Sequence, residues 1–195
     1  MAVKAKPDIR FLNDMKEVLS DQAWAKTAPN LELYYMYRGV KRKGELRYDL
    51  TVIPPQMLGK EFVKTQGHDH SDAYGEVYIV LKGKAIFLVQ NYANGKVKDV
   101  YAVKAKKGDV VPIPPHYSHV TINPSLTETL KEANWVSEKC QNLYKDFLEK
   151  HGACYYFTEG GWTKNERYGI VPKLRFKRPL KSLPKNLDFL YGKQG

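Results

Sequence analysis

The sequence has few of the features that mark secreted, membrane-bound or disulfide-stabilised proteins. It contains only two cysteines, Cys140 and Cys154, and they do not form a CxxC metal motif. No run reaches the roughly 18 consecutive apolar residues of a membrane span. The first residues, MAVKAKPDIR, lack the apolar core of a signal peptide. We therefore expect two reduced thiols in a cytoplasmic protein that has no membrane partner.

Acidic residues are also scarce relative to basic ones. The chain has 32 Lys and Arg residues against 21 Asp and Glu residues, which gives a formal net charge of +11. Much of the excess lies in the basic C-terminal tail, residues 173–195. Such a segment can meet nucleic acid or an acidic surface. No nucleic-acid-binding motif accompanies it, so we expect a solvated surface that attracts small anions and no nucleic-acid partner.

Helical periodicity is confined to two segments, and the remaining chain is rich in β-formers. Residues 13–26 and 137–152 carry apolar groups at helical spacing. Elsewhere, short apolar and β-branched segments alternate with turn residues, as in the Asn-Gly pair of YANGK. The pattern predicts one all-β domain over residues 1–195: an antiparallel sandwich or barrel with a core at about 30–172, an N-terminal helix at 13–26, an inserted helix near 137–152, and a tail that wraps over the body.

Two histidines separated by one residue, His68 and His70, lie within this β-rich part of the sequence. On a strand, residues i and i+2 point to the same side, so both imidazoles project together. Glu76 opens the next apolar segment, EVYIVLKG, and antiparallel pairing would bring it back beside the histidines. One carboxylate and two imidazoles suit a divalent first-row metal.

A further candidate ligand, His119, lies in the downstream segment GDVVPIPPHYSHVTIN. Taken alone, any one of these residues is more often an ordinary surface or core residue. The set of His68, His70, Glu76 and His119 together favours a metal site. His116 is near the same segment, but its place in the Pro-Pro-His-Tyr loop indicates a position on the rim.

The two segments resemble the paired motifs of the cupin superfamily. The first motif, HxH followed by Glu and then, after six residues, Gly, matches His68, His70, Glu76 and Gly83. The second, Gly, five residues, Pro, then His, three residues and Asn, matches Gly108, Pro114, His119 and Asn123. The chain departs from the second motif at His116, where the superfamily usually has glycine. This resemblance implies a cupin, a jelly-roll-like β-barrel.

A closer resemblance covers roughly residues 45–125. DLTVIPPQMLGKEFVKTQGHDH, EVYIVLKGKA and PPHYSHVTIN are similar to the cupin-type phosphoglucose isomerases (glucose-6-phosphate isomerases), which are best known from archaea. The resemblance implies that His68, His70, Glu76 and His119 bind one divalent ion, with Fe²⁺, Mn²⁺, Ni²⁺ and Zn²⁺ as candidates. It also implies a substrate site built from Thr51, Thr65, Gly67, Tyr78 and Tyr168.

The residue chemistry agrees with these implied roles in part. Thr51 and Thr65 offer hydroxyl donors to phosphate oxygens, and Gly67 lets a backbone N–H approach an anion closely. The alternatives are plain strand propensity for the threonines and core packing for Tyr78. Near Tyr168-Gly169 the family has a histidine where this chain has Glu166, so the role of that histidine is not carried over. Arg167 and Lys164 are candidate replacements that would bind phosphate.

The resulting hypothesis is a metal-dependent isomerase of glycolysis and gluconeogenesis that interconverts glucose 6-phosphate and fructose 6-phosphate. Glu76 and Tyr78 are the catalytic candidates, with Glu76 as both ligand and general base. The hydrogen could move through an enediolate or as a hydride. Alternatives are another sugar-phosphate isomerase, a cupin dioxygenase, or a non-catalytic cupin that binds a sugar or nucleotide. The resemblance and the apolar strand edges favour a homodimer.

Overall fold

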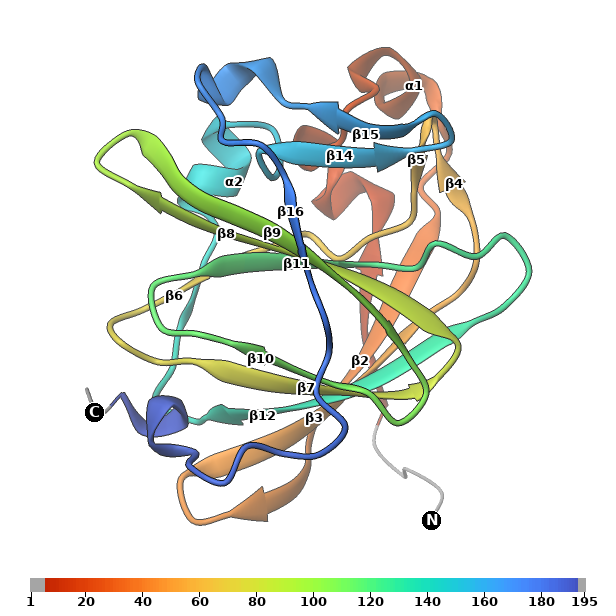
Figure 1. The fold of residues 1–195 in the computed structure, drawn as a ribbon. Coiled ribbons are helices and arrows are strands. Elements are labelled where there is room, and N and C mark those ends of the chain that lie inside the picture. The colour runs from red at the N-terminus through yellow and green to blue at the C-terminus, as the bar shows by residue number, and fades with distance from the viewer. Residues whose placement is uncertain (1–5, 193–195) are drawn as a thin grey trace.

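Two β-sheets form separate layers in the computed structural model, which describes residues 6–192 (Figure 1). The larger sheet contains, in order across it, β1 (Asp8–Phe11), β2 (Glu32–Lys43), β3 (Leu46–Ile53), β12 (Leu130–Ser137), β7 (Glu76–Lys82) and β10 (Val110–Ile113). The smaller sheet contains β11 (Ser118–Ile122), β8 (Lys84–Ala93), β9 (Lys96–Lys106) and β16 (Arg175–Lys177). The pairing within the larger sheet is antiparallel throughout. The predicted mostly β fold is confirmed.

The core lies between the facing surfaces of these sheets. Ile53, Ile113 and Leu130 come from the larger sheet and Phe87 from the smaller one, and each has an exposed fraction of 0%. Burial of such side chains contributes roughly 1.5–3 kcal/mol apiece. The predicted turns are present where β7 meets β8 at Gly83 and where β8 meets β9. Asn94 and Gly95 both have positive φ in that second turn, as a two-residue hairpin requires.

Shorter elements close one side of the two-sheet body. A four-stranded sheet has the order β15 (Gly161–Lys164), β14 (Tyr155–Thr158), β5 (Glu61–Phe62) and β4 (Met57–Leu58), and β13 (Asn142–Leu143) pairs with β6 (Asp69–His70). The helical elements are η1 (Leu12–Asp14), η2 (Lys16–Val18), α1 (Gln22–Thr27), α2 (Lys145–Glu149), η3 (Glu166–Tyr168) and η4 (Asp188–Tyr191). None of the helices in this part of the chain is long and apolar enough to cross a membrane.

The N-terminal helix predicted over residues 13–26 is not continuous. Two 3₁₀ turns come first, and only Gln22–Thr27 is α-helical. Leu12, Met15 and Val18 are all fully buried, and their spacing of three residues matches the 3₁₀ repeat rather than the α repeat. Asp21 then starts α1 as its N-cap by accepting a hydrogen bond from the Trp24 backbone N–H at 3.0 Å.

The inserted helix is shorter than the predicted range 137–152. Ser137 is not a helix cap, because it is the last residue of β12 and pairs with Leu46 of β3. Residues Asn142–Leu143 then form β13, and α2 occupies only Lys145–Glu149. Phe147 of this helix is 1% exposed and packs over Gly67. The insertion therefore covers the region of the candidate site.

The β-structure extends beyond the predicted core of residues 30–172 on both sides. At one end β1 pairs with β2, and at the other β16 pairs in parallel with β9. Further along, Leu180 forms a bridge with Val110, so the tail crosses from the smaller sheet to the edge of the larger one. Figure 1 shows this blue segment lying across the front of the sheets. The prediction that the tail wraps over the body is confirmed for the residues described.

Candidate metal centre and substrate pocket

The four predicted metal ligands come from two segments of the chain, residues 68–76 and the strand that holds His119, and they meet at one point. His68 pairs with His119 of β11 through an isolated β-bridge, His70 lies on β6, and Glu76 begins β7. One ligand atom from each residue lies within 4.8 Å of all the others. The local sequence explains this convergence, because the HxH spacing directs two imidazoles to one side and the following turn returns the chain at Glu76.

The donor atoms surround the Glu76 carboxylate closely. Glu76 Oε2 lies 3.2 Å from His119 Nε2, 3.3 Å from His70 Nε2 and 3.9 Å from His68 Nε2. His68 Nε2 is also 3.2 Å from His70 Nε2. Three imidazole nitrogens and one carboxylate oxygen that converge in this way form a donor set suited to a divalent first-row metal.

Charge states in the cluster are set by burial and by its own hydrogen bonds. Burial lowers the pKa of His68 well below its ordinary value and also lowers the pKa of His119. Burial opposes ionisation of Glu76, but hydrogen bonds with His119 and His70 hold the pKa of that carboxyl well below its usual range. Burial likewise disfavours the charged form of His70, but the hydrogen bond to Glu76 raises its pKa overall. Neutral imidazoles and an ionised carboxylate are the metal-binding forms.

Further polar groups hold the ligands in place. The Tyr78 hydroxyl donates to Glu76 Oε2 at 3.1 Å and lies 2.9 Å from His119 Nε2. The Asn134 side-chain amide donates to Glu76 Oε1, and His70 Nδ1 lies 3.2 Å from the Tyr74 carbonyl oxygen. Such contacts orient metal ligands and tune their basicity. Burial raises the pKa of Tyr78 well above its ordinary value, so its hydroxyl keeps its proton.

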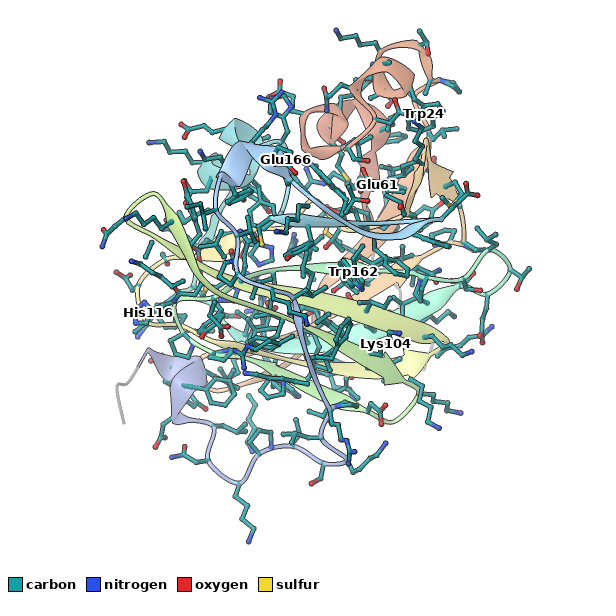
Figure 2. The ribbon with its side chains drawn as sticks, turned by 45° about the horizontal axis from the view of Figure 1, so that its top comes forward. Trp24, Glu61, Lys104, His116, Trp162 and Glu166 are labelled. Carbon is teal, nitrogen blue, oxygen red and sulfur yellow. The ribbon has the colours of Figure 1, made fainter. Side chains whose placement is uncertain are left out.

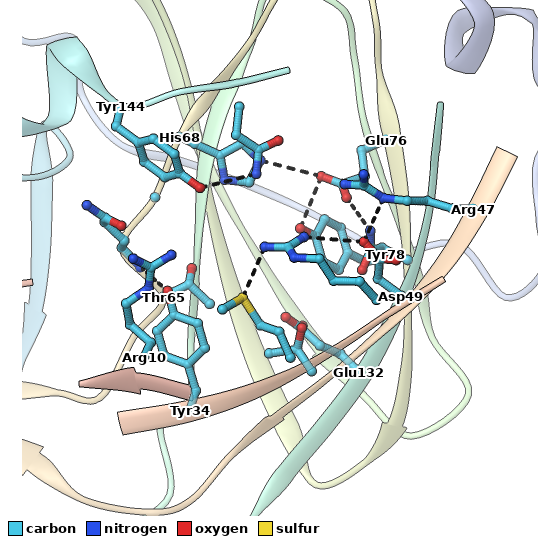
Figure 3. A pocket seen from close by; sticks show the side chains of 17 residues that line it. Arg10, Tyr34, Arg47, Asp49, Thr65, His68, Glu76, Tyr78, Glu132 and Tyr144 are labelled. Atoms are coloured by element: carbon cyan, nitrogen blue, oxygen red, sulfur yellow. Dashed lines mark hydrogen bonds and ion pairs between the residues drawn. The ribbon is translucent and has the colours of Figure 1, made fainter. Parts of the chain in front are cut away.

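A pocket opens directly beside this cluster (Figure 3). His68, Glu76 and Tyr78 line it on the cluster side, and three of the predicted substrate residues, Thr51, Thr65 and Gly67, line it as well. The structure therefore brings together metal ligands and predicted substrate residues around one cavity.

Thr65 and Gly67 have structural constraints that favour their residue types. The Thr65 side-chain oxygen accepts a hydrogen bond from the Thr121 backbone N–H at 3.0 Å, which orients its hydroxyl. Gly67 has a φ of +79°, and a Cβ added there would lie 2.3 Å from Phe147 Cε1. A side chain at position 67 would therefore meet both backbone strain and the helix that covers the site.

Tyr168 is not at the pocket, which corrects its predicted substrate-binding position. It is 5% exposed, its hydroxyl donates to the Gly152 carbonyl oxygen at 2.8 Å, and the Gln90 side-chain amide donates to that hydroxyl at 3.2 Å. The residue therefore packs as part of the core. Tyr144, from the segment at 137–152, lines the pocket instead.

Other polar residues considered from the sequence also lie outside the pocket. Glu166 and His116 are exposed, and Figure 2 shows them in different parts of the molecule. Lys164 and Arg167 are exposed too, and neither lines the pocket. His116 has a φ of +65° in its loop, and its carbonyl oxygen accepts a hydrogen bond from Asn91 at 3.0 Å. It is not a member of the four-residue cluster, as its loop position indicated.

Sequence reasoning missed most of the wall opposite the histidines. That wall includes Arg10, Tyr34, Arg38, Arg47, Asp49, Glu132 and Asn134. Asp49 accepts from Arg47 Nε at 2.9 Å and lies 3.4 Å from Arg38 Nη1. A signal was present in the alternation of the strands, because Asp49 and Thr51 share one face of β3, and Glu132 and Asn134 share one face of β12. Polar residues on an inward face mark a wet cavity rather than a dry core.

Comparisons with known proteins agree with the sequence motifs. The family model described as "Glucose-6-phosphate isomerase (GPI)" matches residues 9–173. A protein named glucose-6-phosphate isomerase from Thermococcus gammatolerans is 35% identical over 174 residues, covering 85% of this chain and 89% of that one. One of the same name from Thermococcus litoralis is 35% identical over 125 residues, covering 61% of this chain. The match spans 64% of the length of the Thermococcus litoralis protein.

Solved structures provide more distant matches. Oxalate oxidase in complex with glycolate has a TM-score of 0.47 and 15% identity, covering 60% of this chain and 57% of that one. The cupin domain of Schizosaccharomyces pombe Cnp3 has a TM-score of 0.40 and 12% identity, covering 58% of this chain and 71% of that one. The family assignment comes from the sequence matches: with residues 9–173 matched and a relative 35% identical over most of both chains, this chain belongs to the glucose-6-phosphate isomerase (GPI) family.

Proposed function

We propose that the protein is a metal-dependent aldose–ketose isomerase that interconverts glucose 6-phosphate and fructose 6-phosphate. One observation carries the proposal: the candidate ligands His68 and Glu76 line the same pocket as Thr51, Thr65 and Gly67. A sugar phosphate bound there would have its phosphate at the hydroxyl groups and its other end at the cluster. The names of the relatives support the same activity.

The proposal includes a metal ion because four candidate ligands converge in the structure. His68, His70, Glu76 and His119 would hold one divalent ion, with Fe²⁺, Mn²⁺, Ni²⁺ and Zn²⁺ as candidates. Such an ion, when bound, supplies Lewis-acid polarisation of a sugar carbonyl and stabilises the negative charge that develops during isomerisation. Tyr78 and Asn134 would orient Glu76 through their hydrogen bonds to its two oxygens.

Substrate binding in this proposal uses the hydroxyl and cationic groups of the pocket. Thr51 and Thr65 would donate to phosphate oxygens, and the Gly67 N–H would approach the same anion. Arg10 lines this part of the pocket beside Tyr34 and Thr65 (Figure 3). A guanidinium group is well suited to phosphate recognition. Tyr144 from the inserted segment would close the pocket over the bound sugar.

The hydrogen transfer between C1 and C2 needs a group beside the sugar carbons. Glu76 and Tyr78 remain our candidates, and both lie at the cluster end of the pocket. The contacts of Glu76 favour ligation over base chemistry, because Asn134 occupies one of its oxygens and Tyr78 and the histidines occupy the other. A homodimer and a cytoplasmic location, both expected from the sequence, stay predictions.

A coupled assay tests this activity directly. Fructose 6-phosphate is supplied to metal-loaded protein, and glucose 6-phosphate formation is followed through an added dehydrogenase. We expect turnover of the phosphorylated sugar and little turnover of unphosphorylated fructose. A metal-loaded sample that binds fructose 6-phosphate without turnover would instead support the non-catalytic alternative. Oxygen consumption with a candidate organic substrate would support a dioxygenase.

A further inference from the structure

A second carboxyl group, that of Glu132, lies in the pocket and takes no part in the metal cluster. Glu132 is only 1% exposed, yet it lines the cavity from the middle of β12 (Figure 3). It pairs with Thr51 of β3 on one side and with Val80 of β7 on the other. Few carboxyl groups are buried so completely without a cationic partner.

The partners of Glu132 leave one of its oxygens free within the described residues. The Thr121 hydroxyl donates to the carboxyl group, but Glu132 Oε2 is buried without a hydrogen-bond partner. Two cationic groups of this wall, Arg38 and Arg47, are both engaged by Asp49. Burial, together with the negative charge of Glu76, raises the pKa of Glu132 to about 8. The carboxyl group is therefore neutral near neutral pH, and it carries an O–H that can donate a hydrogen bond.

Glu132 adjoins the threonines of the pocket, and it also interacts electrostatically with Glu76 and Tyr78 on the cluster side. Its partner across the sheet is Thr51, and facing side chains on paired strands lie about 5 Å apart at Cβ. Its hydrogen-bond partner Thr121 donates a backbone N–H to the Thr65 side chain. Glu132 therefore adjoins both threonines to which we assign phosphate binding.

We propose that Glu132 is a substrate-contacting residue whose neutral carboxyl group donates a hydrogen bond to the phosphate group at Thr51 and Thr65. This inference rests on the proposed function for the identity of the anion. A phosphate offers only acceptor oxygens when ionised, so a neutral carboxyl is complementary to it and a carboxylate is repulsive. Glu132 would thus make phosphate affinity decrease as the pH rises.

Other titrating or charged groups face the same cavity and must be separated from this effect. They are Arg10, Tyr34, Arg38, Arg47, Asp49, His68, Glu76, Tyr78 and Tyr144. Substitution at Glu132 leaves all of them in place. Gln is the informative replacement, because its amide keeps the shape and a donor but has no proton to lose. Leu removes the donor while keeping an apolar side chain of comparable bulk.

The test measures binding of inorganic phosphate and of glucose 6-phosphate by calorimetry, with the metal-loaded parent, Glu132→Gln and Glu132→Leu. We expect Leu to weaken both affinities by about 10- to 100-fold, the usual value of a hydrogen bond to a charged group. Gln should stay within about threefold of the parent near neutral pH and lose the decrease in affinity at alkaline pH. Lys131→Gln, on the exposed face of the same strand, is the matched control.

Three results would overturn the assignment. They are an unchanged phosphate affinity in the Leu variant, a loss for glucose 6-phosphate with none for inorganic phosphate, and a Gln variant that keeps the parent's pH dependence. Melting temperatures of all variants check folding, and a Leu variant that does not fold leaves the Gln comparison decisive. Because inorganic phosphate cannot be isomerised, its binding is measured without turnover, and a parent that binds phosphate but does not isomerise sugar phosphates refutes the proposed function alone.

Discussion

The two ends of the pocket are built in different ways. At the histidine end, the four candidate ligands come from β6, the loop before it, β7 and β11. Their ligand atoms all lie within 4.8 Å of one another, and the residues belong to two compact sequence motifs. On the opposite wall, the polar residues come from β1, β2, β3 and β12, with one to three residues from each strand. The first end is a preassembled donor set, whereas the second is a spread of hydroxyl, guanidinium and carboxyl groups.

Under the proposed function, this difference would separate the residues that set the rate from those that set substrate affinity. A metal centre tolerates little variation, because losing one donor changes the coordination of the ion. The opposite wall can change one strand position at a time, since the side chains that would contact the substrate under our proposal come from several strands. We therefore expect substitutions at the histidine end to reduce the rate and those on the wall to change affinity and pH dependence. Five predictions test this division, from the largest expected effect to the smallest.

The largest effect should come from loss of the metal. Chelation, or His119→Ala, should reduce kcat by on the order of 10³-fold or more, because Lewis-acid stabilisation contributes several kcal/mol. Activity should return to the chelated parent on adding Mn²⁺, Fe²⁺ or Ni²⁺, with metal content measured by elemental analysis. His116→Ala, a change of an exposed histidine outside the cluster, is the control. Full activity in chelator-treated protein with no measurable metal would contradict the metal requirement.

The next effect tests whether Glu76 acts as the general base in addition to binding the metal. With the metal site saturated, Glu76→Gln should lower kcat by about 10²–10⁴-fold if this carboxylate is also the general base. A near-parent rate at proven metal occupancy would restrict Glu76 to ligation and leave Tyr78 or a hydride shift. Deuterium uptake at C2 of the parent's product from heavy water would support proton transfer through an enediolate.

The histidine end of the pocket could be predicted from the sequence better than the opposite wall, because only the histidine end consists of compact motifs. His68, His70, Glu76 and His119 were found because metal ligation imposes short, recognisable spacings on residue types that are otherwise rare in strands. The opposite wall has no such spacing. Arg10 and Glu132 are 122 positions apart in the sequence and line the same pocket only through the strand order, which a single sequence does not supply.

For the fold as well, features set by local sequence were predicted correctly, and features set by tertiary contacts were not. Strands such as β3 and β12 were evident from their composition, and turns such as Asn94-Gly95 from their required φ values. The N-terminal helix was wrong in detail, because tertiary burial of Leu12, Met15 and Val18 selects 3₁₀ turns over a continuous helix. The structure does not place Tyr168 where its predicted substrate role requires, because its ring packs in the core and does not line the pocket.

The pH dependence of stability should reveal the buried carboxyl group of the wall. Glu132 has a folded-state pKa of about 8, above the ordinary value of 4.5, so the folded chain keeps a proton that the unfolded chain releases. The free energy of unfolding should therefore fall as pH rises from about 4.5 to about 8, by on the order of a few kcal/mol, and level off above that.

Urea unfolding at several pH values compares the parent with Glu132→Gln, which cannot titrate. The difference in stability between variant and parent should grow in favour of the variant across this window. Glu159→Gln, at an exposed position, should show no such trend. Parallel pH profiles for the parent and Glu132→Gln would mean that Glu132 is already ionised in the folded protein.

A smaller effect is expected at the phosphate end. Thr65→Val keeps the shape of the side chain and removes its hydroxyl, which should raise KM for glucose 6-phosphate about tenfold with a smaller change in kcat. The reason is that the phosphate is bound alike in the ground and transition states. Steady-state kinetics measures this, with Thr163→Val as the exposed control. A fall in kcat at unchanged KM would place Thr65 at the reacting carbons instead.

The smallest effect on activity should come from Tyr168, which tests the boundary of the site. Tyr168→Phe removes the hydroxyl that donates to the Gly152 carbonyl oxygen and accepts from Gln90. Two buried polar groups then lose a partner, so the free energy of unfolding should fall by about 1–2 kcal/mol. Calorimetry would report a lower Tm by roughly 2–8 °C. Because the ring is in the core and not at the pocket, kcat and KM should change by less than about twofold in protein that remains folded. A large rise in KM without a change in Tm would return Tyr168 to the substrate site and remove the distinction between the pocket wall and the core behind it.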